Sequence, residues 1–210
     1  MERVNYDLEM EKVIAGNSGK PTLLLHSCCA PCSSACLERL FPHFIITVFF
    51  FNPNITESEE YYKRLAEQKR FINEVYGGGI KVVEGRYESA EFFAIAEGLE
   101  KVAEGGERCY KCYEARIKET ALKAKEGGYD YFCTTLSLSP HKNAEWINSL
   151  GKKYEDIIGV KFLPSDFKKR DGYKRSIELS KEYELYRQNY CGCVYSKNER
   201  ADNESNSGKA

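Results

Sequence analysis

The chain has 210 residues, of which 42% are hydrophobic, and a formal net charge of −1. This length and composition suit one domain with an ordinary hydrophobic core better than two domains. The near-neutral charge excludes a general attraction of the whole protein to nucleic acid, and no apolar run is long enough to cross a membrane. Because residues 1–20 lack the basic-then-apolar order of a secretory signal, we expect a cytoplasmic protein without membrane contact.

Five apolar segments are predicted as β-strands and alternate with helical patterns. The strands are expected at 22–27, 45–52, 80–84, 131–135 and 160–163, and the helices at 58–76, 109–126 and 173–187. Continuously apolar runs are typical of strands that are buried on both faces of a parallel sheet. The alternation predicts a doubly wound α/β fold with a mainly parallel, five-stranded sheet and a C-terminal helical segment that carries Cys-Gly-Cys. We expect one domain over residues 1–196 and a disordered polar tail over 197–210.

Thiols and a polar loop are expected at the same edge of this sheet. In doubly wound sheets, ligands bind beyond the carboxyl ends of the strands. Cys28 and Cys29 follow the first predicted strand, and the segment 137–143 follows the fourth. In that segment, Pro140 can occupy the first turn of a helix capped by Ser139, so the loop is either a plain helix start or a substrate contact.

Nine cysteines in a reducing compartment are expected to be thiols or metal ligands rather than structural disulfides. Eight of them lie in three groups, namely Cys28, Cys29, Cys32 and Cys36, then Cys109 and Cys112, then Cys191 and Cys193. A CxxC motif at a helix start brings two sulfur atoms to one side, where the helix dipole helps to keep them deprotonated. Two further thiolates from Cys28 and Cys29, or from Cys32 in place of one of them, would complete a [4Fe–4S] site. A zinc site with four thiolates from the same residues explains the spacing equally well.

The Cys191-Gly-Cys193 group is expected to have a different role. With only one glycine between them, the two cysteines could bind the same metal ion only in a strained geometry. The flexible glycine does allow their sulfur atoms to approach the distance of a disulfide bond. We therefore expect a redox-active pair, with cluster ligation by Cys191 as the alternative. Cys36 is expected to pack within a helix, and Cys133 to lie in the core.

A run of five basic residues follows the last predicted strand in the sequence. It consists of Lys168, Lys169, Arg170, Lys174 and Arg175. Taken alone, this run is explained as well by a solvated basic face as by contacts with phosphates.

Five motifs in combination resemble the cobalamin-independent epoxyqueuosine reductases, the QueH family. They are His-Ser-Cys-Cys-Ala-Pro-Cys-Ser at 26–33, Phe-Asn-Pro-Asn at 51–54, Arg-Cys-Tyr-Lys-Cys-Tyr-Glu-Ala-Arg at 108–116, Thr-Thr-Leu-Ser-Leu-Ser-Pro-His-Lys-Asn at 134–143 and Tyr-Cys-Gly-Cys-Val-Tyr-Ser at 190–196. The resemblance implies an adenine-nucleotide α-hydrolase-like (HUP-like) iron–sulfur domain that reduces epoxyqueuosine to queuosine at the tRNA wobble position. It places the [4Fe–4S] ligands on Cys28, Cys29, Cys109 and Cys112, and the redox pair on Cys191 and Cys193.

The implied reaction asks for electrons and protons. Conversion of an epoxide to an alkene consumes two electrons and two protons and releases water. A cluster passes one electron at a time, so the Cys191 and Cys193 dithiol is a useful second carrier, reduced by a donor such as ferredoxin or flavodoxin. The leaving oxygen needs a proton donor or a Lewis acid. Candidate proton donors are Asp166, His141 and Tyr195, and an additional iron or other metal ion could be held by Cys32 or Asp166.

The implied tRNA substrate gives the basic run a function. Its side chains are expected to contact anticodon-loop phosphates, while nearby tyrosines stack on a splayed base. Further expected substrate contacts are Asn52, Ser139, Lys142 and Asn143.

Two other functions explain parts of the sequence less well than the reductase does. An ATP-dependent tRNA-modifying enzyme of related fold would need a glycine-rich phosphate loop after the first strand, where this chain has Ser27-Cys28-Cys29. A non-redox, zinc-binding tRNA-binding module would not need the Cys-Gly-Cys pair or a crevice lined by His and Lys.

Overall fold

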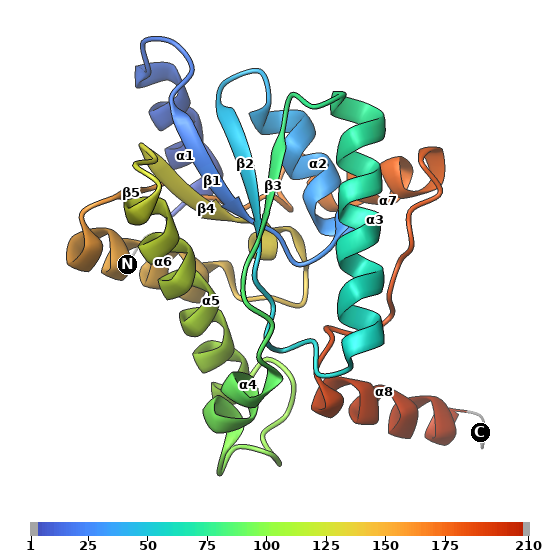
Figure 1. Ribbon diagram of the computed structural model, residues 1–210. Helices are drawn as coiled ribbons and strands as arrows, with labels where there is room; N and C mark the ends of the chain where they lie inside the picture. Colours follow the sequence, from blue (N-terminus) through green and yellow to red (C-terminus); the bar gives the residue numbers. More distant parts are fainter. Residues whose placement is uncertain (1–3, 208–210) are drawn as a thin grey trace.

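The computed structural model describes residues 4–207, which form a parallel sheet covered by helices on both faces (Figure 1). In chain order the elements are α1 (Tyr6–Gly16), β1 (Thr22–His26), α2 (Ala30–Leu40), β2 (Ile45–Phe50), α3 (Ser58–Tyr76), β3 (Lys81–Glu84), α4 (Ser89–Ala96), α5 (Glu107–Glu126), β4 (Tyr131–Thr134), the 3-10 helix η1 (Thr135–Leu138), α6 (Ala144–Ile158), β5 (Lys161–Phe162), α7 (Gly172–Glu182) and α8 (Val194–Ser207). Among these residues, no helix has both the length and the hydropathy of a membrane span.

The five strands are all parallel and lie in the order β3-β2-β1-β4-β5. The chain builds β1, β2 and β3 outward in one direction, then crosses back through α4 and α5 to place β4 on the other side of β1. The strand order therefore reverses between β1 and β4, which is where doubly wound sheets bind ligands. The predicted doubly wound, parallel sheet is confirmed, while its kinship to adenine-nucleotide α-hydrolases stays a prediction.

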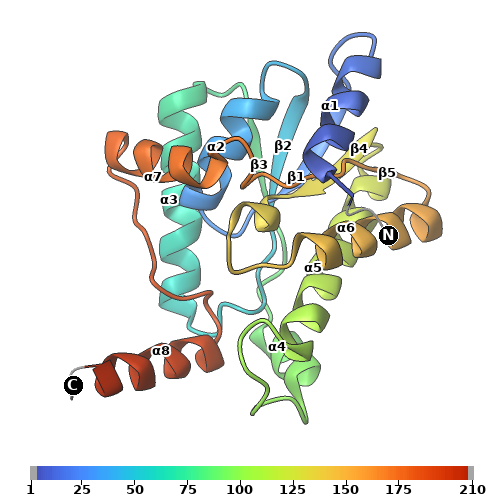
Figure 2. The ribbon, with the colours of Figure 1, turned by 180° about the vertical axis from the view of Figure 1, so that it is seen from behind.

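The two faces of the sheet bury separate hydrophobic clusters, because successive side chains of a strand point to opposite faces. Leu23 and Leu25 of β1 pack with residues of α1, α2, α3 and α7, whereas Leu24 packs with residues of α5 and α6. Figure 2 shows these two helical layers from behind. Burial on both faces is the reason that the strands are continuously apolar.

β1 and β2 end before the predicted strands do. The predicted strands extend to Ser27 and Asn52, but the structure ends β1 at His26 and β2 at Phe50. The Asn52 Nδ2 donates to the carbonyl oxygen of Ser27 at 2.9 Å, so a side chain joins the two segments where the strand ladder stops.

The helix after β4 begins later than predicted. A start at Pro140 with Ser139 as cap is wrong, because η1 occupies the first residues after β4 and the helix starts at Ala144. Asn143 is the cap, and its Oδ1 accepts a hydrogen bond from the Trp146 backbone N at 3.2 Å. Residues 139–142 are thereby left in a loop above the sheet edge.

The C-terminal part differs in two ways from the prediction. α7 ends at Glu182 rather than at residue 187, because Glu184 adopts a left-handed φ of 48° and the chain then leaves the helix. α8 continues to Ser207, where a disordered tail was expected from residue 197, and residues 208–210 lie outside the described residues. The polar composition that suggested disorder also suits a solvent-exposed helix.

Candidate active site

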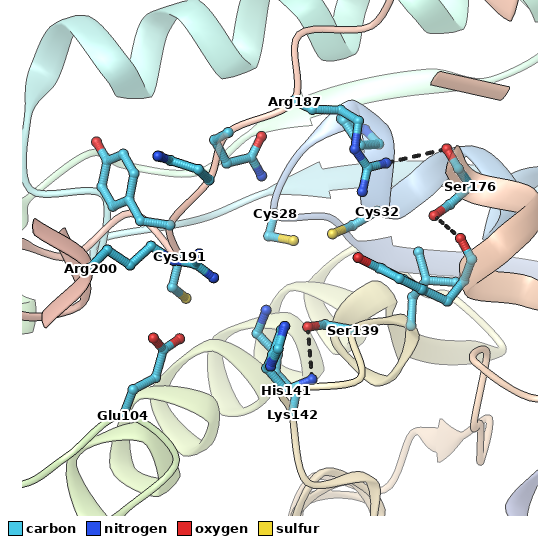
Figure 3. Close-up of a pocket in the computed structure, with 16 residues that line it drawn as sticks. Cys28, Cys32, Glu104, Ser139, His141, Lys142, Ser176, Arg187, Cys191 and Arg200 are labelled. Atoms are coloured by element: carbon cyan, nitrogen blue, oxygen red, sulfur yellow. Dashed lines mark hydrogen bonds between the residues drawn. The ribbon is translucent and has the colours of Figure 1, made fainter. Parts of the chain in front are cut away.

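A cavity of about 360 Å³ opens beyond the carboxyl ends of β1 and β4. Its walls come from the start of α2, the loop before α6, the segment between α7 and α8, and α8 itself. The lining includes Cys28, Cys32, His141, Lys142, Arg187 and Arg200 (Figure 3). This volume lies within the range of pockets that bind small molecules or nucleosides. The predicted crevice of thiols and polar loop residues is therefore present.

Three thiols form a tight triad at this edge. The sulfur atoms of Cys28, Cys29 and Cys32 all lie within 4.8 Å of one another, and those of Cys28 and Cys29 are 3.9 Å apart. Adjacent cysteines can share one side because the chain passes from strand to helix here, with Cys29 as the extended N-cap of α2 and Pro31 in its first turn. Three clustered sulfur donors are a ligand set for a thiophilic metal ion.

Hydrogen bonds set the protonation of the triad. The pKa of Cys28 is held well below its usual value because the thiols of Cys29 and Cys32 donate to its sulfur. As the donor to Cys28, Cys29 has its pKa raised to about 12, and that of Cys32 is raised for the same reason. Cys28 is therefore the thiol of the triad that loses its proton most readily, and a metal would have to displace the protons of the other two.

A second group of thiols lines a neighbouring, much smaller cavity. Cys109 in the first turn of α5 and Cys112 one turn later face Cys191 and Cys193 across it. Gly192 has a φ of 125°, and a Cβ at this position would lie 2.9 Å from Ile55. This conformation favours glycine between the two cysteines.

The four predicted cluster ligands thus fall into two groups. Cys28 and Cys29 lie in the triad, whereas Cys109 and Cys112 line the smaller cavity with the predicted redox pair. Cys191 lines both cavities and connects the two groups. The remaining two cysteines lie where they were predicted, because Cys36 is buried in α2 and Cys133 is buried in β4.

Asn52 supports the site rather than lining the large cavity. Its side chain is fully buried, donates to Ser27 as described, and accepts a long hydrogen bond of 3.4 Å from Nη1 of Arg116. His26, which the sequence analysis did not single out, has a similar role. Its Nε2 donates to the Phe51 carbonyl at 3.0 Å and its Nδ1 accepts from Thr134 Oγ1 at 2.9 Å. Burial, followed by the charge of Arg116, lowers the pKa of His26 to about 3, so the ring is neutral.

Only some of the substrate-contact residues predicted in the loop before α6 line the cavity. Ser139, His141 and Lys142 line it, whereas Asn143 caps α6. Burial lowers the pKa of Lys142, but its electrostatic interactions with the sulfur atoms of Cys191, Cys28 and Cys32 raise it by more, so the ammonium group stays charged.

Of the three candidate proton donors, His141 alone lines this cavity. Asp166 is buried and paired with Lys168. Tyr195 stacks on the guanidinium of Arg108, whose Cζ lies 4.5 Å from the ring centre, and packs against Phe92. His141 is exposed and can reach a bound ligand.

The basic run is largely neutralised. Its ion pairs are Lys168 with Asp166, Arg170 with Asp7 at 2.9 Å, and Arg175 with Glu38 at 2.7 Å. Lys169 and Lys174 are exposed, and no carboxylate within the described chain pairs with either. We call these five residues the 168–175 run.

Three other cations converge on the cavity. Arg187 donates to Ser180 Oγ at 2.9 Å and to the Ser176 carbonyl at 3.4 Å, which are neutral acceptors. Within residues 4–207, neither Lys142 nor Arg200 forms an ion pair with a carboxylate. We call Lys142, Arg187 and Arg200 the cavity cations.

The irregular segment 183–193 forms one wall and is held by side chains of α3. Arg70 Nη2 donates to the Tyr183 carbonyl at 2.8 Å, the Tyr186 backbone N donates to Glu67 at 2.8 Å, and Arg64 Nη1 donates to the Cys191 carbonyl at 3.0 Å. From this wall, Gln188 Nε2 lies 2.9 Å from the sulfur of Cys29. Sequence reasoning missed Arg187 because it placed this residue in the predicted helix 173–187, and it missed Gln188 because a single glutamine after that helix forms no motif.

Comparisons with known proteins identify a family that this chain matches over most of its length. A family model described as epoxyqueuosine reductase QueH matches residues 23–199. A Staphylococcus epidermidis protein of that name is 45% identical over 202 residues, covering 92% of this chain and 85% of its own. Namesakes from Streptococcus pyogenes and Thermotoga maritima are 44% and 37% identical, covering 92% and 86% of this chain and 78% and 93% of their own.

Proposed function

The chain belongs to the QueH family of epoxyqueuosine reductases and is an oxidoreductase, and we propose that it reduces the epoxide of epoxyqueuosine at the tRNA wobble position to the alkene of queuosine. The observation that carries this proposal is the joint lining of one ligand-sized cavity by thiols of the triad and by the cavity cations. A reducing centre beside unpaired positive charge suits a substrate that is carried on a phosphate backbone.

We propose a [4Fe–4S] cluster on Cys28, Cys29, Cys109 and Cys112, with Cys32 as an alternative ligand or as a ligand of an additional metal ion. The residues fit such a group in two respects. The donors are thiols, which suit iron–sulfur clusters, and the buried guanidinium of Arg116 has no carboxylate partner within residues 4–207, so an anionic group would balance its charge. When bound, the cluster would supply electrons one at a time.

The Cys191 and Cys193 thiols can together supply the two electrons and two protons that the reaction consumes. Oxidation of two thiols to a disulfide releases two electrons and two protons, and the conversion of an epoxide to an alkene and water consumes the same number. The C–O bonds of the epoxide break and one S–S bond forms. A one-electron donor of the ferredoxin or flavodoxin class would then restore the dithiol in two steps. Gly192, with its φ of 125°, gives the backbone between the two cysteines the conformational freedom that disulfide formation would require.

The loop before α6 would handle the oxygen. Lys142 is charged and lines the cavity, so its ammonium group would donate a hydrogen bond to the epoxide oxygen as negative charge develops. His141 lies beside it and would supply the proton to the leaving oxygen.

The cavity cations would bind phosphates of the anticodon loop. An unpaired cation can exchange its counterions for phosphate oxygens, which is the main source of affinity for nucleic acid. Lys169 and Lys174 are further candidates from the 168–175 run. Tyr173 and Tyr190 also line the cavity and are candidates for stacking on the splayed base.

Nucleoside analysis of tRNA tests the activity directly. Anaerobically reconstituted protein, a low-potential reductant and tRNA containing epoxyqueuosine should give queuosine, recognised in the digest by the loss of one oxygen atom. A Cys191→Ser variant that keeps its iron should give none. Unchanged epoxide with the iron-loaded wild type would overturn the proposal, and stoichiometric zinc without iron uptake would favour the zinc-binding module.

A further inference from the structure

Arg116 is a buried cation that faces the smaller thiol-lined cavity. It lies on α5 one turn after Cys112, so the two side chains share a helix face. The side chain is 1% exposed. Its Nε donates to the Cys112 carbonyl at 3.3 Å and its Nη1 to Asn52 Oδ1 at 3.4 Å, both long contacts. Its Nη2 has no hydrogen-bond partner among the described residues.

Two other arginines are equally buried, and both are paired. Arg64 contacts Glu60 at 2.6 Å and Arg108 contacts Glu199 at 3.1 Å, whereas no carboxylate of residues 4–207 lies within 4.0 Å of Arg116. A guanidinium cannot lose its proton in a protein, so burial cannot be relieved by deprotonation. An unpaired buried charge is strongly destabilising, so we expect an anionic group to balance Arg116 in the working protein.

The surroundings identify that anion. Arg116 lines the small cavity together with Cys109, Cys112, Cys191 and Cys193. We infer that Arg116 is a positioning residue that balances the charge of the thiolate-held metal group and donates to it through Nη2. This inference rests on the proposed metal cofactor and assigns a residue outside its ligands.

The inference predicts a change in reduction potential. Reduction adds negative charge to the group, and a nearby cation stabilises the reduced form. Arg116→Gln should shift the redox equilibrium against a reference dye at least tenfold toward the oxidised form, which is 59 mV for a one-electron couple. Arg116→Lys keeps the charge and should shift it by less than threefold. Arg86→Gln removes the same charge from an exposed ion pair and should leave the potential unchanged.

Metal retention provides a second measurement that does not need a redox-active metal. A [4Fe–4S]²⁺ cluster and a Zn²⁺ ion each carry a net charge of about −2 when four thiolates bind them. Arg116→Gln should therefore lose its metal at a chelator concentration about tenfold lower than the wild type, and Arg116→Lys should not. If the Gln variant does not fold, Arg116→Met tests the same loss of charge with a flexible apolar side chain that suits a buried position.

The possible outcomes separate the two proposals. A wild type that takes up zinc alone would end the iron–sulfur proposal, while the chelator titration would still decide on Arg116. Equal potentials and equal metal retention in folded wild type, Gln or Met, and Lys variants would overturn the inference. An equal loss in the Gln and Lys variants would also overturn it, because it would show a role in shape and not in charge.

Discussion

The 168–175 run and the cavity cations are both positively charged, but they differ in whether carboxylates neutralise that charge. The run is contiguous in sequence, yet three of its five side chains are paired with carboxylates, two of which lie on α1 and α2. The cavity cations come from three separate segments and have no carboxylate partner within residues 4–207. The clustering of basic residues along the sequence is therefore a poor indication that they bind an anion. An unpaired charge beside a cavity is the better indication of an anionic ligand.

The largest effect should come from removing two cavity cations together. Arg187→Gln with Arg200→Gln should weaken binding of an anticodon stem-loop by about 100-fold, because two charge-assisted contacts of about 1.5 kcal/mol each are lost. Fluorescence anisotropy at fixed salt would measure this. Arg170→Gln with Arg175→Gln is the matched control, and a comparable loss in this control would reverse the comparison.

A second comparison concerns the effect of Lys142 on the rate of epoxide reduction. Lys142→Met should lower kcat/KM for epoxide reduction by about tenfold, through the loss of one charge-assisted hydrogen bond to the oxygen. Arg170→Met removes a cation of the 168–175 run that is already paired with Asp7, and it should change kcat/KM by less than twofold. Equal effects of the two variants would contradict the assignment of Lys142.

Salt dependence should distinguish single residues. Arg200→Gln should reduce the slope of log K against log salt concentration by about 0.7, the value for one contact with a single-stranded phosphate. Arg170→Gln should leave the slope unchanged, since its charge is already paired with Asp7. Parallel anisotropy titrations at several salt concentrations would test both expectations.

The smallest effect concerns stability. Arg170 is 55% exposed and Asp7 is 5% exposed, so the loss of their ion pair in Arg170→Gln should lower the free energy of unfolding by less than about 1 kcal/mol. Arg200→Gln should leave it unchanged. Urea unfolding followed by circular dichroism would show whether the run stabilises the fold while the cavity cations do not.

Local sequence patterns were sufficient to predict much of the fold and the positions of the thiols relative to the strands and helices. The apolar runs predicted five parallel strands, and the triad follows β1 as expected, because strand ends and turn residues are local features. The pairing of charges is a tertiary property. Neither the missing partner of Arg116 nor the ion pairs of Arg170 and Arg175 can be deduced from neighbours along the chain. Arg187 could not be identified from the sequence as a cavity residue. The apolar periodicity of the predicted helix continues past Glu184, whose left-handed φ ends the helix in the structure.

The wall at 183–193 has a consequence for assembly during synthesis. Its contacts are made to α3, and it closes a site whose triad, CxxC motif and α6 loop all precede it in the chain. Since a ribosome releases the chain in order, the earlier thiols emerge before the wall that covers them. The growing chain thus passes through a stage in which the thiol-bearing edge is open, and the docking of one late segment closes it.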